Sequence, residues 1–462
     1  MFNIEQLEQL KHRAVGIHLA GQSKQAEDIY RRMIAHGSTD PEVFHNLGII
    51  CSSTKRQVQA ISLFRASLSV NPDFAEAHFG LAGTLAEMHP AEAEKHYRRA
   101  LALSPGMTIA KDQLGIVLWR MGRIHESIES FRSAIKDRPD SVSLHNHLSM
   151  SLLLDGQLEE GFAEAEHRFQ MEKYRRACKM PWKKRQWDGD FSTRDTVVFI
   201  AEPGFGDLFQ YVRLAGQVRR RGVRVALQAK GSVRALLDTS GCYDAFYAAD
   251  EDFDEATHSW YPLFSLPHLL GTTLDSIPAT VPYLSAEQEK VERWKKILPQ
   301  GKRLIGINWQ GNPAHETTLL GGRSIPLKFF SAIASLPDVV LVSLQKQHGL
   351  EQLASCPFRD KILLFDETTY PSEPAFLEAA AMIKALDLVV TSDTSIAHLA
   401  GALATPVWVG LQYIPDFRWL LERNDSPWYP SMKLYRQQAP HDWTSVFARI
   451  KNDLGNDPVG NF

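Results

Sequence analysis

Cysteine is scarce in this chain of 462 residues. Only Cys51, Cys178, Cys242 and Cys356 occur, and each stands alone in the sequence. No two of them have the CxxC spacing of a zinc ribbon or a redox motif, and four scattered thiols are too few for a disulfide scaffold. We interpret all four as ordinary buried or surface thiols.

An excess of charge of one sign is also missing. Lys and Arg number 51 against 54 Asp and Glu, a net charge of −3, which argues against a nucleic-acid partner. No apolar run approaches the roughly 18 residues of a membrane span, and the first residues lack the apolar core of a signal peptide. These absences predict a chain without a membrane span and a cytoplasmic location. The 44% hydrophobic share is that of an ordinary globular protein.

A repeat of 33 or 34 residues fills the first third of the chain. A small residue and, four positions later, an aromatic residue recur at that period: Ala26 with Tyr30, Ala60 with Phe64, Ala93 with Tyr97, and Ser127 with Phe131. The small residue allows two helices to approach closely, and the aromatic side chain fills the gap to the next repeat. This pattern resembles the tetratricopeptide repeat and predicts an all-α solenoid over residues 1–178 with about five repeats.

The concave groove of such a solenoid usually binds peptides or proteins. On the repeat numbering, we expect His45, Phe79, Asp112 and Asn146 to face this groove, so these residues are candidates for recruiting a protein partner. The alternative is that the solenoid serves only as a spacer or as a dimerisation element of a homo-oligomer.

The remainder of the chain alternates strand and helix patterns. A polar stretch rich in basic and aromatic residues, 179–195, is interpreted as a linker. Two series of βαβ units follow, which predicts parallel sheets covered by helices. We expect two Rossmann-like halves, 196–298 and 299–462, the second with a C-terminal helix. Expected strands are 196–201, 223–229, 303–309, 339–344, 362–365 and 386–391. This outline is that of the two-domain GT-B architecture, although a two-domain binding protein or a dehydrogenase has a similar one.

The loop after the first strand contains Gly204, Gly206 and Asp207. It begins like a dinucleotide fingerprint, but Phe209 replaces the third glycine and no acidic residue ends the next strand, which disfavours NAD. Asp207 is expected at a helix N-terminus beside the cleft. It can cap that helix, or it can act as a general base, although the helix dipole lowers the pKa of a carboxylate there.

Two loops of the second half are suited to phosphate. Residues 392–395 (SDTS) open a helix that carries His398, and short hydroxyl side chains with free N–H groups at a helix start can bind a diphosphate. His398 can also be an ordinary buried histidine. The loop 308–313 leads through a polar segment, 315–322, to Arg323, whose guanidinium can bind phosphate in a bidentate manner or form a surface salt bridge.

Metal-site motifs are incomplete. His315 and Glu316 begin an HExxH pattern, but the second histidine is missing. The DxD patterns at 188–190 and 252–254 do not follow hydrophobic strands, so we interpret them as surface acids. We therefore expect no metal and no cofactor, with a nucleotide sugar only as substrate.

Taken together, these loops are similar to those of the heptosyltransferase-type glycosyltransferases of family nine, and more closely to bacterial proteins that fuse tetratricopeptide repeats to such a domain. The resemblance extends over residues 182–437. Its motifs are Trp187-Asp-Gly189, Glu202-Pro-Gly-Phe-Gly-Asp207, Trp309-Gln-Gly-Asn-Pro313, Arg323-Ser-Ile-Pro326, Ser343-Leu-Gln345, Ser392-Asp-Thr394, Pro406-Val-Trp408, Asp416-Phe-Arg-Trp419 and Ser426-Pro-Trp-Tyr-Pro430.

The resemblance implies a GT-B fold and a set of site residues. Asp207 matches the catalytic aspartate, with Gly204, Gly206, Gln210 and Arg213 on the acceptor side. The implied donor-side residues are Trp309, Gly311, Asn312, Arg323, Gln345, Asp393, Thr394, Ser395 and His398. Pro203 and Leu214 depart from the family pattern on the acceptor half.

The resemblance further implies a metal-independent, inverting glycosyltransferase. It would transfer a sugar from a nucleotide donor to a hydroxyl on a protein, such as a flagellin or another surface protein, recruited by the repeat groove. Two alternatives stay open: a lipopolysaccharide-type transferase whose repeats serve for docking, and a non-catalytic interaction scaffold. The presence of Asp207 and of the loop 392–395 argues against the scaffold.

Overall fold

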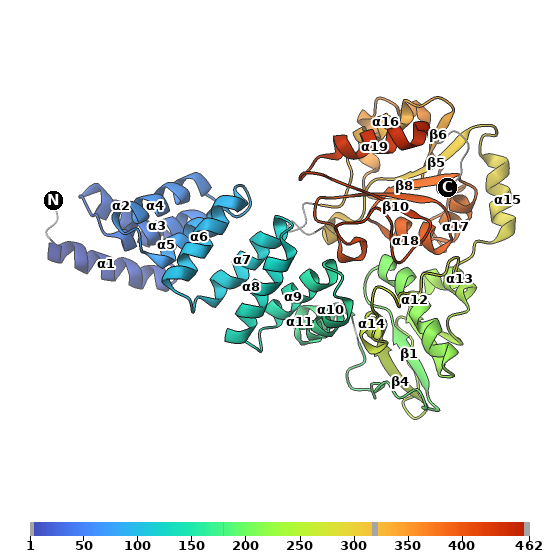
Figure 1. The fold of residues 1–462 in the computed structure, drawn as a ribbon, viewed down its shortest axis with the longest axis horizontal. Coiled ribbons are helices and arrows are strands. Elements are labelled where there is room, and N and C mark those ends of the chain that lie inside the picture. The colour runs from blue at the N-terminus through green and yellow to red at the C-terminus, as the bar shows by residue number, and fades with distance from the viewer. Residues whose placement is uncertain (1–3, 179, 317–321, 457–462) are drawn as a thin grey trace. The chain divides into compact units, whose positions relative to one another are not determined.

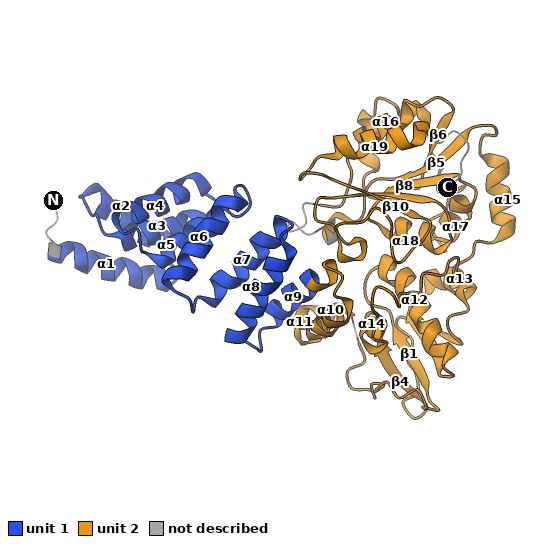
Figure 2. Ribbon diagram, viewed as in Figure 1, with its two compact units in different colours: residues 1–151 blue, residues 152–462 orange. Residues whose placement is uncertain are grey.

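The computed structural model describes residues 4–178, 180–316 and 322–456. The chain separates into two units, residues 1–151 and residues 152–462 (Figure 2). No helix of the described ranges is long and apolar enough to cross a membrane.

Consecutive antiparallel helix pairs fill the first part of the chain, as the repeat predicts (Figure 1). The helices are α1 (Ile4–Leu19), α2 (Ser23–Ala35), α3 (Pro41–Ser53), α4 (Gln57–Val70), α5 (Ala75–Leu85), α6 (Pro90–Leu103), α7 (Thr108–Arg120), α8 (Ile124–Asp137), α9 (Val142–Leu154) and α10 (Leu158–Ala165). The boundary between the units falls within α9.

The repeating aromatic residues form the core of the first unit. Phe64 on α4 is 1% exposed and lies between α3 and α5, where a Cβ on Gly48 or Gly80 would come within 2.8 Å and 2.5 Å of its ring. In the same way, a Cβ on Gly115 would lie 2.5 Å from the ring of Phe131. The period of the sequence is thus the period of this packing, with one buried aromatic side chain for each helix pair.

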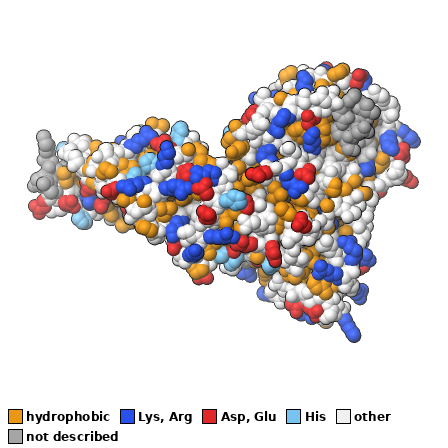
Figure 3. Space-filling view, viewed as in Figure 1, with side chains coloured by type: hydrophobic (Ala, Val, Ile, Leu, Met, Phe, Trp, Pro, Cys, Tyr) orange, Lys and Arg blue, Asp and Glu red, His pale blue; other side chains and the backbone are white. Residues whose placement is uncertain are grey.

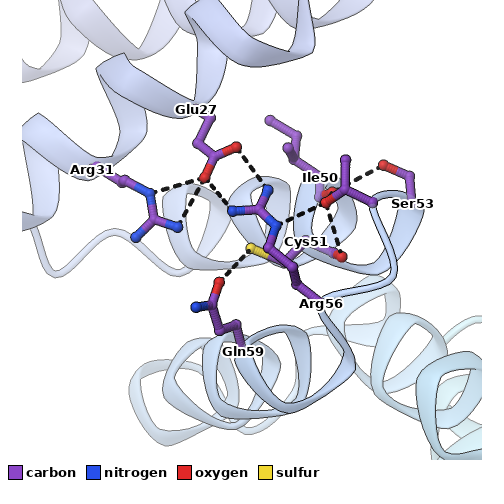
Figure 4. A network of polar contacts seen from close by, with 8 residues as sticks. Glu27, Arg31, Ile50, Cys51, Ser53, Arg56 and Gln59 are labelled. Carbon is purple, nitrogen blue, oxygen red and sulfur yellow. Dashed lines mark hydrogen bonds and ion pairs between the residues drawn. The ribbon is translucent and has the colours of Figure 1, made fainter.

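Ion pairs connect successive repeats. Arg56 donates to Glu27 of the preceding repeat with Nη1–Oε1 and Nη2–Oε2 distances of 2.5 and 2.7 Å, as Figure 4 shows. Arg123 and Glu94 form the same contact two repeats later, at 2.6 Å. In Figure 3, both basic and acidic side chains lie on the visible face of the repeats. The two pairs described above each join neighbouring repeats.

The second unit contains two parallel sheets. The first has the order β3-β2-β1-β4, and the second has the order β10-β9-β8-β5-β6-β7 (Figure 1). The strands are β1 (Thr196–Ile200), β2 (Arg224–Ala229), β3 (Ala245–Ala248), β4 (His258–Pro262), β5 (Arg303–Asn308), β6 (Val339–Ser343), β7 (Ile362–Leu363), β8 (Leu388–Ser392), β9 (Val407–Leu411) and β10 (Met432–Arg436). The predicted order, an all-α repeat array followed by an α/β part with two parallel sheets, is confirmed.

Helices join and cover the two sheets. After β1 comes α12 (Phe205–Arg220), which packs against α18 (Ser395–Ala402) of the second half. Between the halves lies α15 (Gln288–Ile297), held to α17 (Leu377–Lys384) because Lys290, Arg293 and Trp294 all donate to the buried carboxylate of Glu378. The last helix of the described residues is the predicted C-terminal helix, α19 (Trp443–Asn456). Contact between α12 and α18 brings the loops at their N-termini together.

The segment that joins the repeats to the first sheet also belongs to the second unit (Figure 2). It contains α10, the 3-10 helix η1 (Glu166–Gln170) and α11 (Glu172–Cys178). Phe162 of α10 is 1% exposed and contacts Phe264 and Phe417 edge to face, at centroid distances of 6.0 and 6.1 Å. In the stretch assigned to a linker, Trp187 is buried beside β4, where its backbone N–H donates to Trp260 O at 2.8 Å.

Candidate active site

A cavity of about 1040 Å³ lies within the second unit, where loops at the carboxyl ends of strands from both sheets meet. Ligands of open α/β sheets bind at this edge. Most of the residues that the sequence singles out line it: Gly204, Gly206, Asp207, Gly311, Asn312, Arg323, Gln345, Asp393, Thr394, Ser395 and His398.

Asp207 lies in the first turn of α12 and faces the cavity. The residue before this helix, Gly204, has φ of +130°, a conformation that side chains with a Cβ rarely adopt, and a Cβ there would lie 2.8 Å from Asp207 Oδ2. Glycine therefore lets the backbone turn tightly and pass directly beside the carboxylate.

Arg418 is the partner of this carboxylate, from the other half of the unit. Its Nη2 donates to Asp207 Oδ1, and its Nη1 donates to Asp416 Oδ1 at 2.7 Å. The side chain of Arg418 is only 9% exposed, whereas that of Asp207 is 34% exposed. The guanidinium thus bridges two carboxylates that line the cavity. Asp416 and Arg418 belong to a motif of the family resemblance, but sequence reasoning gave them no role.

The electrostatics of Asp207 are a balance of two opposing effects. Burial in the cavity raises its pKa, because the charged form loses hydration, and the guanidinium of Arg418 opposes that rise. The nearby carboxylate of Asp416 adds to the rise. A carboxylate with a raised pKa is a better proton acceptor than a solvated one.

Asp393 faces the same cavity from the loop after β8. Burial, together with the charge of Asp416, raises the pKa of Asp393 to about 6, and the cations Arg323 and Arg418 oppose this shift. The carboxylates of Asp207, Asp393 and Asp416 thus line the same cavity as the guanidiniums of Arg323 and Arg418.

Hydrogen bonds between loops fix the donor-side wall. Gln345 accepts from the backbone N–H groups of Trp309 and Gln310 at 2.9 and 3.0 Å. Asn308 donates to the same Gln345 oxygen at 3.1 Å and accepts from the hydroxyl of Thr394 at 2.9 Å. Gln345 and Thr394 therefore hold the loops after β5, β6 and β8 in fixed positions relative to one another.

Groups able to bind an anion lie on the same wall. Thr394 precedes α18 in the N-cap position without capping it by its side chain, and Ser395 begins the helix. Arg323 lies over Gly311, where a Cβ would come 3.2 Å from Nη2, and its Nε has no hydrogen-bond partner among the described residues. A helix N-terminus beside a guanidinium is suited to a phosphate group. Of the polar segment 315–322, residues 317–321 lie outside the described residues.

His398 is buried on the first turn of α18, with its Nδ1 3.0 Å from the hydroxyl of Tyr429. Burial and the nearby arginines hold the pKa of His398 well below its usual range, so the ring is neutral at physiological pH. A Cβ on Gly206 would lie 2.8 Å from its Cδ2. The absence of a side chain at position 206 allows the histidine to approach the Asp207 loop.

Three of the predicted residues lie behind the cavity wall. Trp309 is fully buried and donates from Nε1 to Gly349 O at 3.0 Å. Arg213 is 4% exposed and donates to Trp428 O, Pro278 O and the hydroxyl of Tyr283 at 2.7, 3.1 and 2.6 Å, which ties α12 to the second half. Gln210 is fully buried, and neither polar atom of its amide has a partner among the described residues.

The predicted groove residues differ in exposure. His45 is 9% exposed and contacts Phe74 at a centroid distance of 5.0 Å, so it is part of the packing. Phe79, Asp112 and Asn146 are partly exposed. Asp112 is paired with His147, at an Oδ1–Nδ1 distance of 2.8 Å.

Comparison with protein families agrees with this architecture. Residues 59–108 and 113–170 match the model of the tetratricopeptide repeat, and residues 364–411 match the model of glycosyltransferase family 9 (heptosyltransferase). The latter match includes β8, the loop with Asp393 and Thr394, and α18. The chain therefore combines tetratricopeptide repeats with a glycosyltransferase family 9 domain, as the sequence motifs predict.

Among characterised proteins, the chain is similar to protein FlbA of Caulobacter vibrioides, with 21% identity over 441 residues that cover 90% of this chain and 73% of FlbA. A peroxisomal targeting signal receptor of Candida albicans is 29% identical over 160 residues, which cover 34% of this chain and 26% of the receptor. The similarity to FlbA thus includes both the repeats and the α/β part.

Two solved structures match part of the chain. The match to the structure of MamA covers 38% of this chain and 97% of the MamA chain, with 18% identity and a TM-score of 0.34. The match to YrrB, described as a TPR protein with an unusual peptide-binding site, covers 35% of this chain and 83% of the YrrB chain. The identity is 16% and the TM-score is 0.32.

Proposed function

We propose that this protein transfers a sugar from a nucleotide-sugar donor to a hydroxyl group on a protein recruited by its repeats. One observation carries the proposal: a single cavity brings Asp207 of the first half opposite Arg323 and the N-terminus of α18 in the second half. The glycosyltransferase family 9 domain implies a sugar donor, and tetratricopeptide repeats imply protein binding.

The donor diphosphate would bind at the second half. The guanidinium of Arg323 and the backbone N–H groups that begin α18 at Ser395 supply positive charge for it. Gly311 leaves the loop after β5 without a side chain at this point, so a phosphate can approach the backbone. These groups would stabilise the negative charge that develops on the leaving diphosphate. Because they provide this charge, the proposed reaction does not depend on a metal.

Asp207 would act as the general base. The acceptor oxygen attacks the anomeric carbon, its proton passes to the Asp207 carboxylate, and the bond to the diphosphate breaks with its electron pair leaving on the phosphate oxygen. A single displacement from the opposite face inverts the anomeric configuration. Arg418 would orient the carboxylate, and the neutral ring of His398 would stay available for a hydrogen bond to the donor.

The repeats would bring the acceptor to the enzyme. The partly exposed members of the predicted groove are Phe79, Asp112 and Asn146. These three residues are the candidates for contacting the acceptor protein. A flagellin or another surface protein, modified in the cytoplasm before export, remains the acceptor that we propose. The compartment is part of this proposal.

A second candidate is a transferase that modifies a lipid-linked saccharide. The description of the matching family as heptosyltransferase favours it. In that case the repeats would dock the enzyme on other proteins, and the groove residues would not affect transfer to a small acceptor.

Calorimetry on the full chain with UDP, GDP and ADP, in buffer containing EDTA, tests the donor site. We expect one of the three to bind without metal, and the corresponding nucleotide sugar to compete with it. Failure of all three to bind at millimolar concentration, with and without Mg²⁺, would contradict a nucleotide-sugar site.

A further inference from the structure

Glu202 is a buried carboxylate in the wall of the cavity. It follows β1 by two positions and precedes Asp207 by five, and its side chain is only 6% exposed. Burial raises the pKa of Glu202, and the charge of Arg168 opposes that rise. An ionised side chain in such a place requires close partners, because its desolvation is unfavourable.

The partners of Glu202 come from the segment that follows the repeats. Arg168 in η1 donates from Nη2 to Glu202 Oε1 at 2.9 Å, and the hydroxyl of Tyr174 in α11 donates to Glu202 Oε2. Both carboxylate oxygens are therefore bound from one side, by the segment that connects α10 to the first sheet.

Arg168 itself is fixed from all directions. It is 5% exposed and donates further to Ser265 Oγ at 2.8 Å and to Glu166 Oε1 at 2.7 Å. Its guanidinium also lies over the rings of Phe169 and Phe264, at 4.0 and 4.8 Å from their centroids. These contacts leave the guanidinium one orientation, which is the orientation that holds Glu202.

The position of Glu202 determines that of the loop with Asp207. Only residue 203 separates Glu202 from Gly204, whose backbone passes close enough to Asp207 that a Cβ would lie 2.8 Å from Oδ2. A shift of Glu202 would therefore change the surroundings of the Asp207 carboxylate directly. Misplacement of a reacting group by about 1 Å can lower a rate by about 10²-fold.

We propose that Arg168 is a positioning residue that holds Glu202, and through it the 202–207 loop, in place for transfer, so that the segment following the repeats completes the catalytic centre. This inference deepens the proposed function and rests on it. Packing alone does not require the pair, since buried ion pairs can often be replaced by apolar side chains without loss of stability.

Hydrogen–deuterium exchange on the full chain tests this without knowledge of the substrate. We expect Arg168→Met to increase exchange in peptides covering residues 201–208 and to leave the peptides of β8 and α18 unchanged. Arg176→Met is the matched control, because Arg176 is 78% exposed and pairs with the exposed Glu172. If both variants exchange alike in the loop, the proposal is wrong.

Transfer kinetics give the second readout. Arg168→Met should lower kcat by about 10-fold or more, with nucleoside diphosphate affinity unchanged, and Arg168→Lys should restore part of the loss. If Glu202 were itself the base, Glu202→Gln would abolish turnover while Arg168→Lys left it intact, which would overturn a positioning role.

Two outcomes separate this inference from the proposed function. If wild-type protein shows no transfer, the proposed function fails, and the exchange experiment still decides whether Arg168 holds the loop. If Arg168→Met does not fold, Arg168→Gln removes the charge that pairs with Glu202 and keeps a polar side chain beside Ser265. Unchanged loop exchange in that folded variant would also overturn the proposal.

Discussion

Arg418 and Asp207 form an ion pair across the cavity, although 211 residues separate them in the sequence. The pair joins the two halves of the transferase part at the residue that we propose as general base. Arg418 also contacts Asp416, so the guanidinium orients the Asp207 carboxylate from a fixed point on the second half.

Replacing Arg418 should change the pH dependence of transfer. The rate requires ionised Asp207 and therefore falls as pH drops through the pKa of this group, which burial raises. Arg418 favours the ionised form, so Arg418→Met should raise the pKa further and move the acid limb of kcat/KM to higher pH, by about one unit or more. The control is Arg423→Met, since Arg423 pairs with the exposed Asp425. An acid limb that moves to lower pH or does not move would remove this interaction from the mechanism.

Donor affinity should depend on Arg323 and Thr394. Arg323→Ala and Thr394→Val should each weaken binding of the nucleoside diphosphate by about 1–3 kcal/mol, the effect of losing hydrogen bonds to a charged group. Calorimetry measures it, with the exposed Arg359→Ala as a control on the same half. Thr394→Val also removes the bond to Asn308, so part of its effect would come from loop order. Unchanged affinity in both variants would place the phosphates elsewhere.

The repeat groove should affect the acceptor and not the donor. The triple change of Phe79, Asp112 and Asn146 to alanine should reduce glycosylation of the intact acceptor protein and leave diphosphate affinity and helix content unchanged. Val58→Ala, at a site that is 78% exposed on α4, is the control. Full modification of the acceptor by the triple variant would favour a docking role for the repeats.

The transferase part should require residues 152–178. Phe162→Ala removes a fully buried ring between Phe264 and Phe417 and should reduce the free energy of unfolding of the second unit by about 3–5 kcal/mol. Denaturant unfolding followed by tryptophan fluorescence measures this. A fragment that begins at residue 179 should be less stable than one that begins at residue 141, and equal stability of the two would contradict the packing of α10 described above.

The repeats could be predicted in detail because their packing is local. Phe64 contacts glycines of the two neighbouring helices, so each contact recurs with the period of the sequence. The strands β1, β2, β5, β6 and β8 were also predictable, since they are apolar runs between turn residues. In contrast, β3 and β10 lie at sheet edges. β3 has only four residues, and β10 contains Lys433 and Arg436, so neither gives a strong apolar pattern.

The loops of the candidate site could be predicted from one rule, because carboxyl ends of parallel strands meet at one sheet edge. The side chains that pair with these loops from across the cavity could not be predicted. Nothing in the sequence near Asp207 indicates Arg418, and nothing near Glu202 indicates Arg168, since pairing at such separations depends on the tertiary fold. The same limit applies to α10, whose repeat-like sequence does not indicate that Phe162 packs against Phe264 and Phe417.

The most direct test of the central claim is mass spectrometry of surface proteins from a deletion strain complemented with wild-type protein or with Asp207→Asn. The amide keeps the shape of the carboxylate but cannot accept a proton, and loss of a general base lowers turnover by about 10²-fold or more. We predict that a glycan mass disappears from at least one surface protein on deletion, that the wild type restores it, and that Asp207→Asn does not, although it still binds the nucleoside diphosphate. Surface proteins of unchanged mass in the deletion strain, or equal restoration by both forms, would contradict the account.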